Sequence, residues 1–319
     1  KNYQRTTSAA ILPSENRVKA EVFYNKASVF KKLVYCYMIL GGIALVLALL
    51  GALCGKSFAL AQKILFAAFA ICFIAHTLAL ALRWYVAAHA PWSDSYESMI
   101  YIGWSAALAG IIFFRKSLLT LSASCLLASI VMLVAHMSFV NPQITNLVPV
   151  LKSYWLSIHV SVITASYGFL GLSCLLGLLA LVLMALKNSA NRERLNAQIR
   201  YITAINEISL IVGLSMLTLG NFFGGVWANE SWGRYWGWDS KETWSYVSII
   251  VYAIVLHLKF IPKLGSIYVY CVSSTLAYSS IIMTYFGVNF YLTGMHSYAA
   301  GDAPQIPAPF YCIIAAVFL

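Results

Sequence analysis

The chain has 319 residues, of which 61% are hydrophobic and only 10% are charged, and its mean hydropathy is +0.79. This composition excludes a soluble globular domain, in which about 25% of residues are charged. Several apolar stretches reach the length of about 18 residues that indicates a membrane helix, and backbone groups in a bilayer must be satisfied within such segments. We therefore predict an all-α fold, a polytopic transmembrane helical bundle of about eight to nine helices.

The net charge of +11 would suggest nucleic acid as the partner of a soluble protein. In a membrane protein it indicates basic cytoplasmic loops and contact with anionic head groups of the lipid bilayer, so we expect no nucleic-acid partner. The seven cysteines lie in or beside apolar segments, and none forms a CxxC pair. They are typical of small buried hydrophobic residues and predict neither a disulfide framework nor a zinc site.

Residues 1–30 are polar and of mixed charge, and we predict an external tail or linker there, followed by a transmembrane domain over residues 31–319. Its apolar segments are expected at 33–54, 58–86, 98–114, 117–139, 155–186, 204–226, 243–261 and 266–292, with a final run that starts near Pro309. The chain starts at Lys1 rather than Met and shows no signal peptide, as expected of a fragment or of the later part of a longer polypeptide.

Basic residues in the short loops predict the orientation of the bundle. The loop 187–200 carries four Lys or Arg residues and is therefore expected in the cytoplasm. Alternation along the chain puts three further groups of basic residues on that side: Lys56 with Lys63, Arg115 with Lys116, and Lys259 with Lys263. It puts three stretches outside: residues 89–97, 224–244 and 294–308. Lys31 and Lys32 also fall outside, against the rule, which an upstream domain already fixed on the outer side would explain.

The external loop 224–244 holds an unusual concentration of tryptophan. Its five indole rings belong to Trp227, Trp232, Trp236, Trp238 and Trp244. One interpretation is an aromatic belt, because Trp and Tyr gather at membrane interfaces. A belt needs only one or two rings per helix end, however, and flat rings in a wet cleft suit a large, flat, partly apolar ligand. A porphyrin fits that description, and its iron needs axial ligands such as His.

Charged residues lie between these rings. Asp239, followed three residues later by Glu242, resembles a capping box that would begin the next helix and so aim Trp236 and Trp238. Arg234 could bind a haem propionate, because a guanidinium can hold a carboxylate with two hydrogen bonds, or it could be a solvated loop charge. Arg83, at a predicted outer helix end, could do the same or extend to the interface.

Three of the six histidines are candidate iron ligands. His159 lies about one turn into its helix from the outer face, and His296 lies just beyond the outer end of another helix. Together with the Trp-rich loop they make a plausible bis-histidine haem site. His257 follows Trp244 by 13 residues in one apolar segment, or about 20 Å of helix toward the cytoplasm. It therefore cannot share a haem with the other two.

The remaining histidines have plainer explanations. An ionisable residue within a membrane is costly and is functional by default, so mid-helix His76 could be a ligand, although a packing role is favoured. His89 precedes Pro91 in an outer loop and could shape that loop or contact haem. His136, near the outer end of its segment, is interpreted as structural.

A family resemblance rests on several of these motifs in order. It is carried by the sequence WGRYWGWDSKETW, which resembles the Trp-rich "WWD" signature of haem-handling membrane proteins, and by its KETW ending, which is similar to CcsA, the core of the System II cytochrome c synthase. The stretches HAPW and YES precede it, and GMHSY follows it. The resemblance extends over residues 83–298.

The resemblance implies a function and a set of roles. Haem b would be ligated by His159 and His296 and held by the Trp residues with Arg234 and Asp239, on the outer (periplasmic) face of the bacterial inner membrane. His257 would be the family's transmembrane histidine, with a partner ligand from CcsB, separate or fused upstream. The implied enzyme is a cytochrome c haem lyase, which joins haem to the CXXCH segment of apocytochrome c by thioether bonds. A haem exporter that passes haem on without ligating it is the alternative, and a channel or structural subunit without haem is a third.

Overall fold

The computed structural model describes residues 13–114, 117–137, 140–144, 153–292 and 294–295, and the regular elements within these ranges are all helical. The helices are α2 (Glu15–Ala27), α3 (Val29–Cys54), α4 (Ala59–Ala87), α5 (Ser95–Phe113), α6 (Leu118–Ala135), α7 (Tyr154–Ala185), α8 (Arg192–Trp232), α9 (Ser240–His257), α10 (Ile267–Ile282) and α11 (Val288–Tyr291). A 3-10 turn (Leu258–Phe260) follows α9, and a π-helical turn (Met283–Gly287) joins α10 to α11.

Eight helical stretches in the described ranges are long and apolar enough to cross a membrane. The predicted all-α, polytopic bundle is therefore confirmed. The predicted segment that starts near Pro309 lies outside the described residues.

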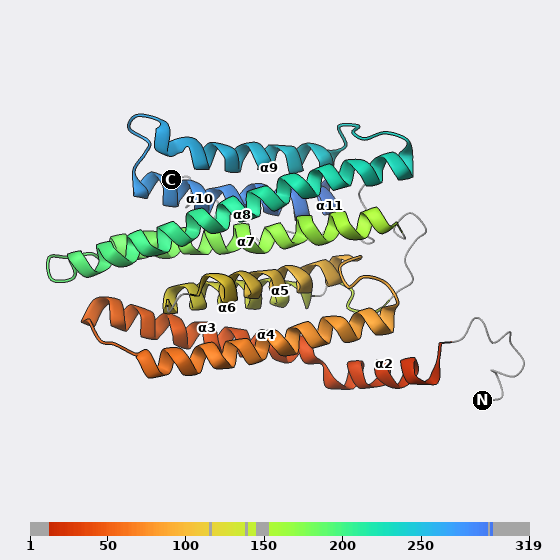
Figure 1. Cartoon of the computed structure of the whole chain (residues 1–319), viewed down its shortest axis with the longest axis horizontal. Helices are drawn as coiled ribbons and strands as arrows, with labels where there is room; N and C mark the ends of the chain where they lie inside the picture. Colours follow the sequence, from red (N-terminus) through yellow and green to blue (C-terminus); the bar gives the residue numbers. More distant parts are fainter. Residues whose placement is uncertain (1–12, 115–116, 138–139, 145–152, 293, 296–319) are drawn as a thin grey trace, which may run out of the picture.

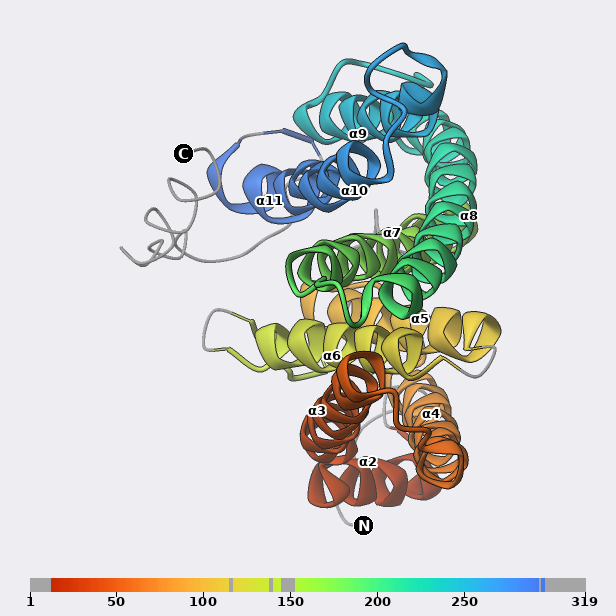
Figure 2. The same ribbon diagram turned by 90° about the vertical axis from the view of Figure 1, so that its left-hand side faces the viewer.

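The helices lie side by side in layers that follow the order of the chain. In Figure 2, α2 lies beside α3 and α4, the next layer holds α5 and α6, then come α7 and α8, and finally α9 with α10. Successive connections alternate between the two ends of the bundle (Figure 1). The basic connections after α3, α7 and α9 lie at one end, opposite the connections after α4 and α8, as the sequence predicted.

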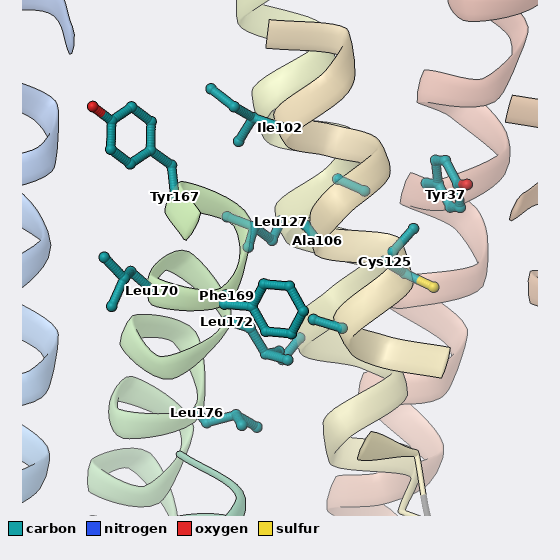
Figure 3. Packing of buried hydrophobic residues seen from close by; sticks show 14 of the residues in the cluster. Tyr37, Ile102, Ala106, Cys125, Leu127, Tyr167, Phe169, Leu170, Leu172 and Leu176 are labelled. Atoms are coloured by element: carbon teal, nitrogen blue, oxygen red, sulfur yellow. The ribbon is translucent and has the colours of Figure 1, made fainter. Parts of the chain in front are cut away.

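Small residues and hydroxyl groups bring the central helices together. Ser122 Oγ in α6 donates to the Gly41 carbonyl of α3 at 2.9 Å, and Ser105 Oγ in α5 donates to the Ala165 carbonyl of α7 at 2.6 Å. Such contacts suit a bilayer, where water cannot compete and close approach supplies van der Waals attraction. Apolar side chains, among them Leu170 and Leu176, fill the space between these layers (Figure 3).

The stretch predicted as a tail contains a helix. Ser14 caps α2 by accepting from the Arg17 N–H, and Ser28, with φ 45°, separates α2 from α3. Arg17 Nε donates to the Val86 carbonyl at the end of α4, at 2.7 Å. α2 has no fully buried residue. Polar contacts and the partly buried ring of Tyr24, which packs edge to face on Phe30, attach it to the bundle, and its polar sequence is why hydropathy did not reveal it.

Helix α8 is much longer than the apolar segment 204–226 that predicted it. It runs for 41 residues, or about 62 Å, roughly twice the thickness of the hydrocarbon core. Most of the predicted loop 187–200 is its first turns, where Arg194 Nε donates to the Ala52 carbonyl at the end of α3, at 2.6 Å. Its last turns extend into the predicted loop 224–244. Charged and polar residues dominate the first turns, and two glycines with the polar run Asn229–Ser231 lower the hydropathy of the last ones, so hydropathy alone gave too short a helix.

The six cysteines in the described ranges are free thiols. Cys125 and Cys271 are buried, as predicted, whereas Cys36 and Cys54 are exposed on the surface of the bundle. An apolar bilayer would cover such a surface equally well, because a thiol behaves as a small hydrophobic group.

Candidate functional site

The Trp-rich stretch is divided between a helix and a short loop. Trp227 and Trp232 belong to the last turns of α8, which ends at Gly233 with φ 72°. Trp227 is 1% exposed and meets Trp232 edge to face, with 4.8 Å between ring centroids. The irregular loop is therefore only residues 233–239, and three of the five predicted platform rings are part of a helix, two in α8 and one in α9. Gly233 was the available signal, because a glycine in the left-handed region commonly ends a helix.

The loop itself presents a pair of perpendicular rings. Trp236 and Trp238 lie 5.7 Å apart, with ring planes at 90°, and Tyr246 of α9 lies 6.4 Å from Trp236. Trp238 is 70% exposed and has φ 57°, a left-handed conformation that costs a non-glycine residue about 1–2 kcal/mol. Strained backbone conformations are concentrated at functional sites. Trp244, already inside α9, is half-buried.

The predicted capping box at the start of α9 is confirmed. Asp239 Oδ2 accepts from the Lys241 N–H at 3.3 Å, and Glu242 Oε2 accepts from the N–H groups of Asp239 at 3.2 Å and Gly237 at 2.8 Å. The two carboxylates therefore stabilise the conformation of the loop by accepting hydrogen bonds from backbone N–H groups in and next to it. This arrangement fixes the direction in which the loop enters α9, and with it the positions of the indole rings of Trp236 and Trp238.

His159 lies on the face of α7 that packs against α8, next to Gly224 and Trp227. Its Nδ1 lies 2.7 Å from the Gly220 carbonyl, so Nδ1 carries the proton and donates. In that tautomer the lone pair is on Nε2, and such a backbone partner is the usual way to orient a metal-binding imidazole. The His159 ring is parallel to that of Trp227, with planes 10° apart and centroids 6.3 Å apart.

Three glycines that sequence reasoning missed allow close packing on α8, and one of them, Gly224, makes room for this histidine. A Cβ on Gly224 would lie 2.6 Å from His159 Cε1, and a Cβ on Gly220 would lie 3.0 Å from Ile163 Cβ. Gly225 is covered by the loop, because its Cβ would lie 3.1 Å from the Tyr235 carbonyl oxygen. The signal was present as the spacing GxxxG in an apolar helix, which is typical of close helix packing. Gly224 therefore lets His159 lie against α8, and the neighbouring Gly225 lets the loop at Tyr235 lie against the same helix.

Arg234 lies across the loop. Its guanidinium occupies the space over Gly237, where a Cβ would fall 0.8 Å from Nη1, and Nη2 lies 2.8 Å from the sulfur of Met295. Met295 is also joined to the loop through its backbone, since its N–H donates to Asp239 Oδ1 at 2.7 Å. His296 is the next residue in the chain and lies outside the described residues.

Arg83 is part of a buried ion cluster. Its Nε donates to Glu97 Oε1 at 2.8 Å, both side chains are fully buried, and Nη1 donates to the Tyr24 hydroxyl at 2.8 Å. Asp94 Oδ2 lies 3.7 Å from Nη2, and His89 Nδ1 lies 3.6 Å from Glu97 Oε2. Burial raises the pKa of the Asp94 carboxyl, and its hydrogen bond from the Glu97 N–H opposes the rise. Full burial contradicts the predicted extension of Arg83 to the interface, and its predicted propionate binding stays a prediction.

The other histidines are accounted for by packing and position. His76 is fully buried, with the Tyr37 hydroxyl 3.4 Å from Nδ1 and the Ile100 carbonyl 3.1 Å from Nε2, in agreement with a packing role. His136 ends α6, and its Nδ1 is 2.7 Å from the Met132 carbonyl. His257 is the exposed last residue of α9, at the end opposite the Trp-rich loop.

A family model described as "Cytochrome C assembly protein" matches residues 92–296, more than half of the chain. The chain belongs to the cytochrome c assembly protein family. The matched range contains His159, the Trp-rich stretch and the chain that leads back to the loop at Met295. The family resemblance predicted from the motifs is therefore confirmed.

Individual relatives agree with this membership. Protein NrfI of Wolinella succinogenes is 50% identical over 308 residues, which cover 94% of this chain and 33% of NrfI. The cytochrome c biogenesis protein CcsA of Prochlorococcus marinus (strain MIT 9301) is 32% identical over 248 residues, covering 70% of this chain and 80% of CcsA. CcsA of Chlorella vulgaris is 33% identical over 258 residues, covering 70% and 81%. This CcsA-like cytochrome c assembly protein thus spans a third of the length of NrfI and most of CcsA.

Proposed function

We propose that this chain is the haem-presenting part of a cytochrome c synthase. It binds haem b at the outer face of the bacterial inner membrane and holds it for attachment to the CXXCH segment of apocytochrome c. The observation that carries the proposal is the placement of His159, oriented by the Gly220 carbonyl directly beside the Trp-rich loop. The family's role in cytochrome c assembly supplies the substrates.

The residues present fit haem better than a bare metal ion. The described ranges contain no group of three or more His, Cys, Asp or Glu side chains that could hold a metal. A porphyrin brings four nitrogen ligands of its own and needs only axial ligands from the protein. His159 supplies one, and we assign the other to His296. The half-buried Trp236 and the exposed Trp238 support the ring, and Arg234 is near enough to the loop surface to meet a propionate.

The reaction requires no nucleophile from this chain. Each CXXCH thiol adds across one haem vinyl group, so that sulfur bonds to one carbon, the thiol proton ends on the other, and no atom is lost. The protein's contribution is to hold the two reactants in register, which can supply several kcal/mol of the barrier. When the histidine of CXXCH replaces one axial ligand, the product haem is released from the site.

The test is a ligation assay with purified protein. A Soret band in the isolated wild-type protein, followed by thioether formation with a CXXCH peptide, is the expected result. Haem binding without ligation would favour an exporter, and absence of haem would favour a channel or structural subunit. A version of the assay with CcsB added tests whether that partner is required.

The substitution Gly224→Ala is expected to lower haem bound at the outer site about 10- to 100-fold, the usual effect of disturbing a metal ligand's support. The new methyl group would lie 2.6 Å from His159 Cε1 and must push the ring away from the Gly220 carbonyl. Haem content per purified protein measures the effect. Gly225→Ala is the matched control, because its methyl group meets the Tyr235 carbonyl rather than the histidine. Equal haem in both variants would contradict the role of Gly224.

The substitution Trp238→Gly is expected to weaken haem retention about tenfold while leaving the stability of the protein within about 1 kcal/mol. Glycine removes the cost of the left-handed backbone, which offsets the lost edge-to-face contact with Trp236 of about 0.5–1.5 kcal/mol. Haem release and thermal unfolding in detergent measure the two effects. Tyr235→Ala removes another exposed ring of the loop as a control. Loss of the protein from the membrane would instead favour an aromatic belt.

The substitution His257→Ala is expected to lower haem loading in cells several-fold without changing the spectrum of the haem that remains. We assign His257 to haem supply, because it lies at the far end of α9, about 27 Å along the helix axis from the loop. Haem added from outside should restore ligation in detergent. The control is Ile254→Ala, an exposed position one turn earlier. Wild-type loading in cells would contradict a role in supply.

A further inference from the structure

The Trp-rich loop and the last described part of the chain are joined by contacts from several residues. The Met295 N–H donates to Asp239 Oδ1 at 2.7 Å, and the Met295 sulfur lies 2.8 Å from Arg234 Nη2. Lys241 Nζ, two residues after Asp239, donates to Asn289 Oδ1 of α11 at 2.8 Å. Met295 is thus held through both its backbone and its side chain, and by two different residues of the loop.

The Asp239 carboxylate makes two kinds of contact. It accepts from the Lys241 N–H (through Oδ2) and from the Glu242 N–H as the helix cap, and its Oδ1 accepts in addition from Met295, 56 residues further along the chain. A helix cap needs only one acceptor, and Ser, Thr or Asn would supply it. A carboxylate offers a second, charged acceptor, and hydrogen bonds to an ionised group are roughly twice as strong as neutral ones. The carboxylate at this position therefore does more than capping requires.

The chain opposite Asp239 is shaped to allow this contact. A Cβ on Gly294 would lie 2.4 Å from Asp239 Oδ1 and 3.0 Å from its Cγ, so a side chain there would force the carboxylate away. The close approach depends on glycine at residue 294. Asp239 and Gly294 thus fit one another across the junction of the loop with the later segment.

We propose that Asp239 is a positioning residue, which ties the chain at Gly294–Met295 to the Trp-rich loop so that the two parts of the haem site move as one unit. The inference rests on the proposed function, in which His296, the residue after Met295, is the second axial ligand. A haem held from both faces requires its two ligands and its ring support to keep a fixed separation, and loose support is costly at such sites. Asp239 acts on haem through this tie rather than by touching iron.

Two variants test the tie from opposite sides. Asp239→Ser retains a good helix cap but has one oxygen on a shorter side chain, and Gly294→Ala leaves Asp239 intact while blocking its approach. Hydrogen exchange of the peptide containing Met295, measured on the full chain without haem, should be about tenfold faster at the Met295 amide in both variants. Ser266→Ala, which removes the cap of α10 at the opposite end of the bundle, is the control and should leave that amide unchanged.

The haem content of the same variants tests whether Asp239 positions the second axial ligand. Both variants should lower haem bound at the outer site about tenfold, and added imidazole should restore it, because a free imidazole can take the place of a misplaced axial ligand. Unchanged exchange at Met295, or wild-type haem without imidazole in both variants, would overturn the inference. Failure of the wild-type protein to bind haem or to ligate the peptide would instead count against the proposed function, and the exchange measurement would still decide whether the tie exists.

Discussion

The His159→Ala protein is expected to lose haem from the outer site, and cytochrome c maturation should fall at least about 100-fold, because even removing the supporting partner of a metal-binding histidine costs up to that much. The physical reason is that the His159 imidazole is held in one tautomer by the Gly220 carbonyl, which leaves its Nε2 lone pair for iron. The absorption spectrum of the purified protein and the yield of holocytochrome c measure the effect.

Two controls separate ligation from folding. Added imidazole should partly restore both haem and activity in His159→Ala, since a free imidazole can enter the space left by the ring. His136→Ala removes another outer-end histidine with a backbone partner, and it should retain haem. Normal outer haem together with normal maturation in His159→Ala would rule out this residue as an iron ligand.

The substitution Arg83→Met is expected to destabilise the protein by about 3–5 kcal/mol, because it leaves Glu97 buried and unpaired. Both side chains are fully buried and 2.8 Å apart, so water cannot replace the lost partner. For a chain of this size the thermal midpoint in detergent should fall by about 10 °C. Attachment of α2 should weaken as well, since Arg83 also holds the Tyr24 hydroxyl.

The double variant Arg83→Met with Glu97→Gln tests this explanation. Removing both charges leaves no buried unpaired ion, so at least half of the lost stability should return. Lys19→Met is the surface control: its pair with Glu15 is more than two-thirds exposed on both sides, and its loss should cost less than about 1 kcal/mol. A double variant no more stable than Arg83→Met alone would show that the charges are not the cause.

Sequence patterns predicted most of the fold because hydropathy reports directly on what a bilayer accepts. The segments predicted at 58–86 and 155–186 end within one residue of α4 and α7. The capping box was equally accessible, because Asp239 and Glu242 interact with their own helix start. Hydropathy failed where the helix continues in residues of low mean hydropathy, as in α2 and both ends of α8. Hydrogen bonds and scattered buried side chains, among them Leu195, Ile199 and Trp227, attach the ends of α8.

By itself, the sequence determined that this is a helical membrane protein of the cytochrome c assembly family with a Trp-rich connection between two helices. These properties depend on composition and on motifs that are continuous in the chain. Only the tertiary structure decided that His159 lies against Gly224, that Arg83 is sealed in an ion cluster, and that Asp239 reaches Met295. Each of these contacts joins residues that are separated in the sequence. Whether such residues meet depends on how the helices pack, and a local sequence pattern does not contain that information.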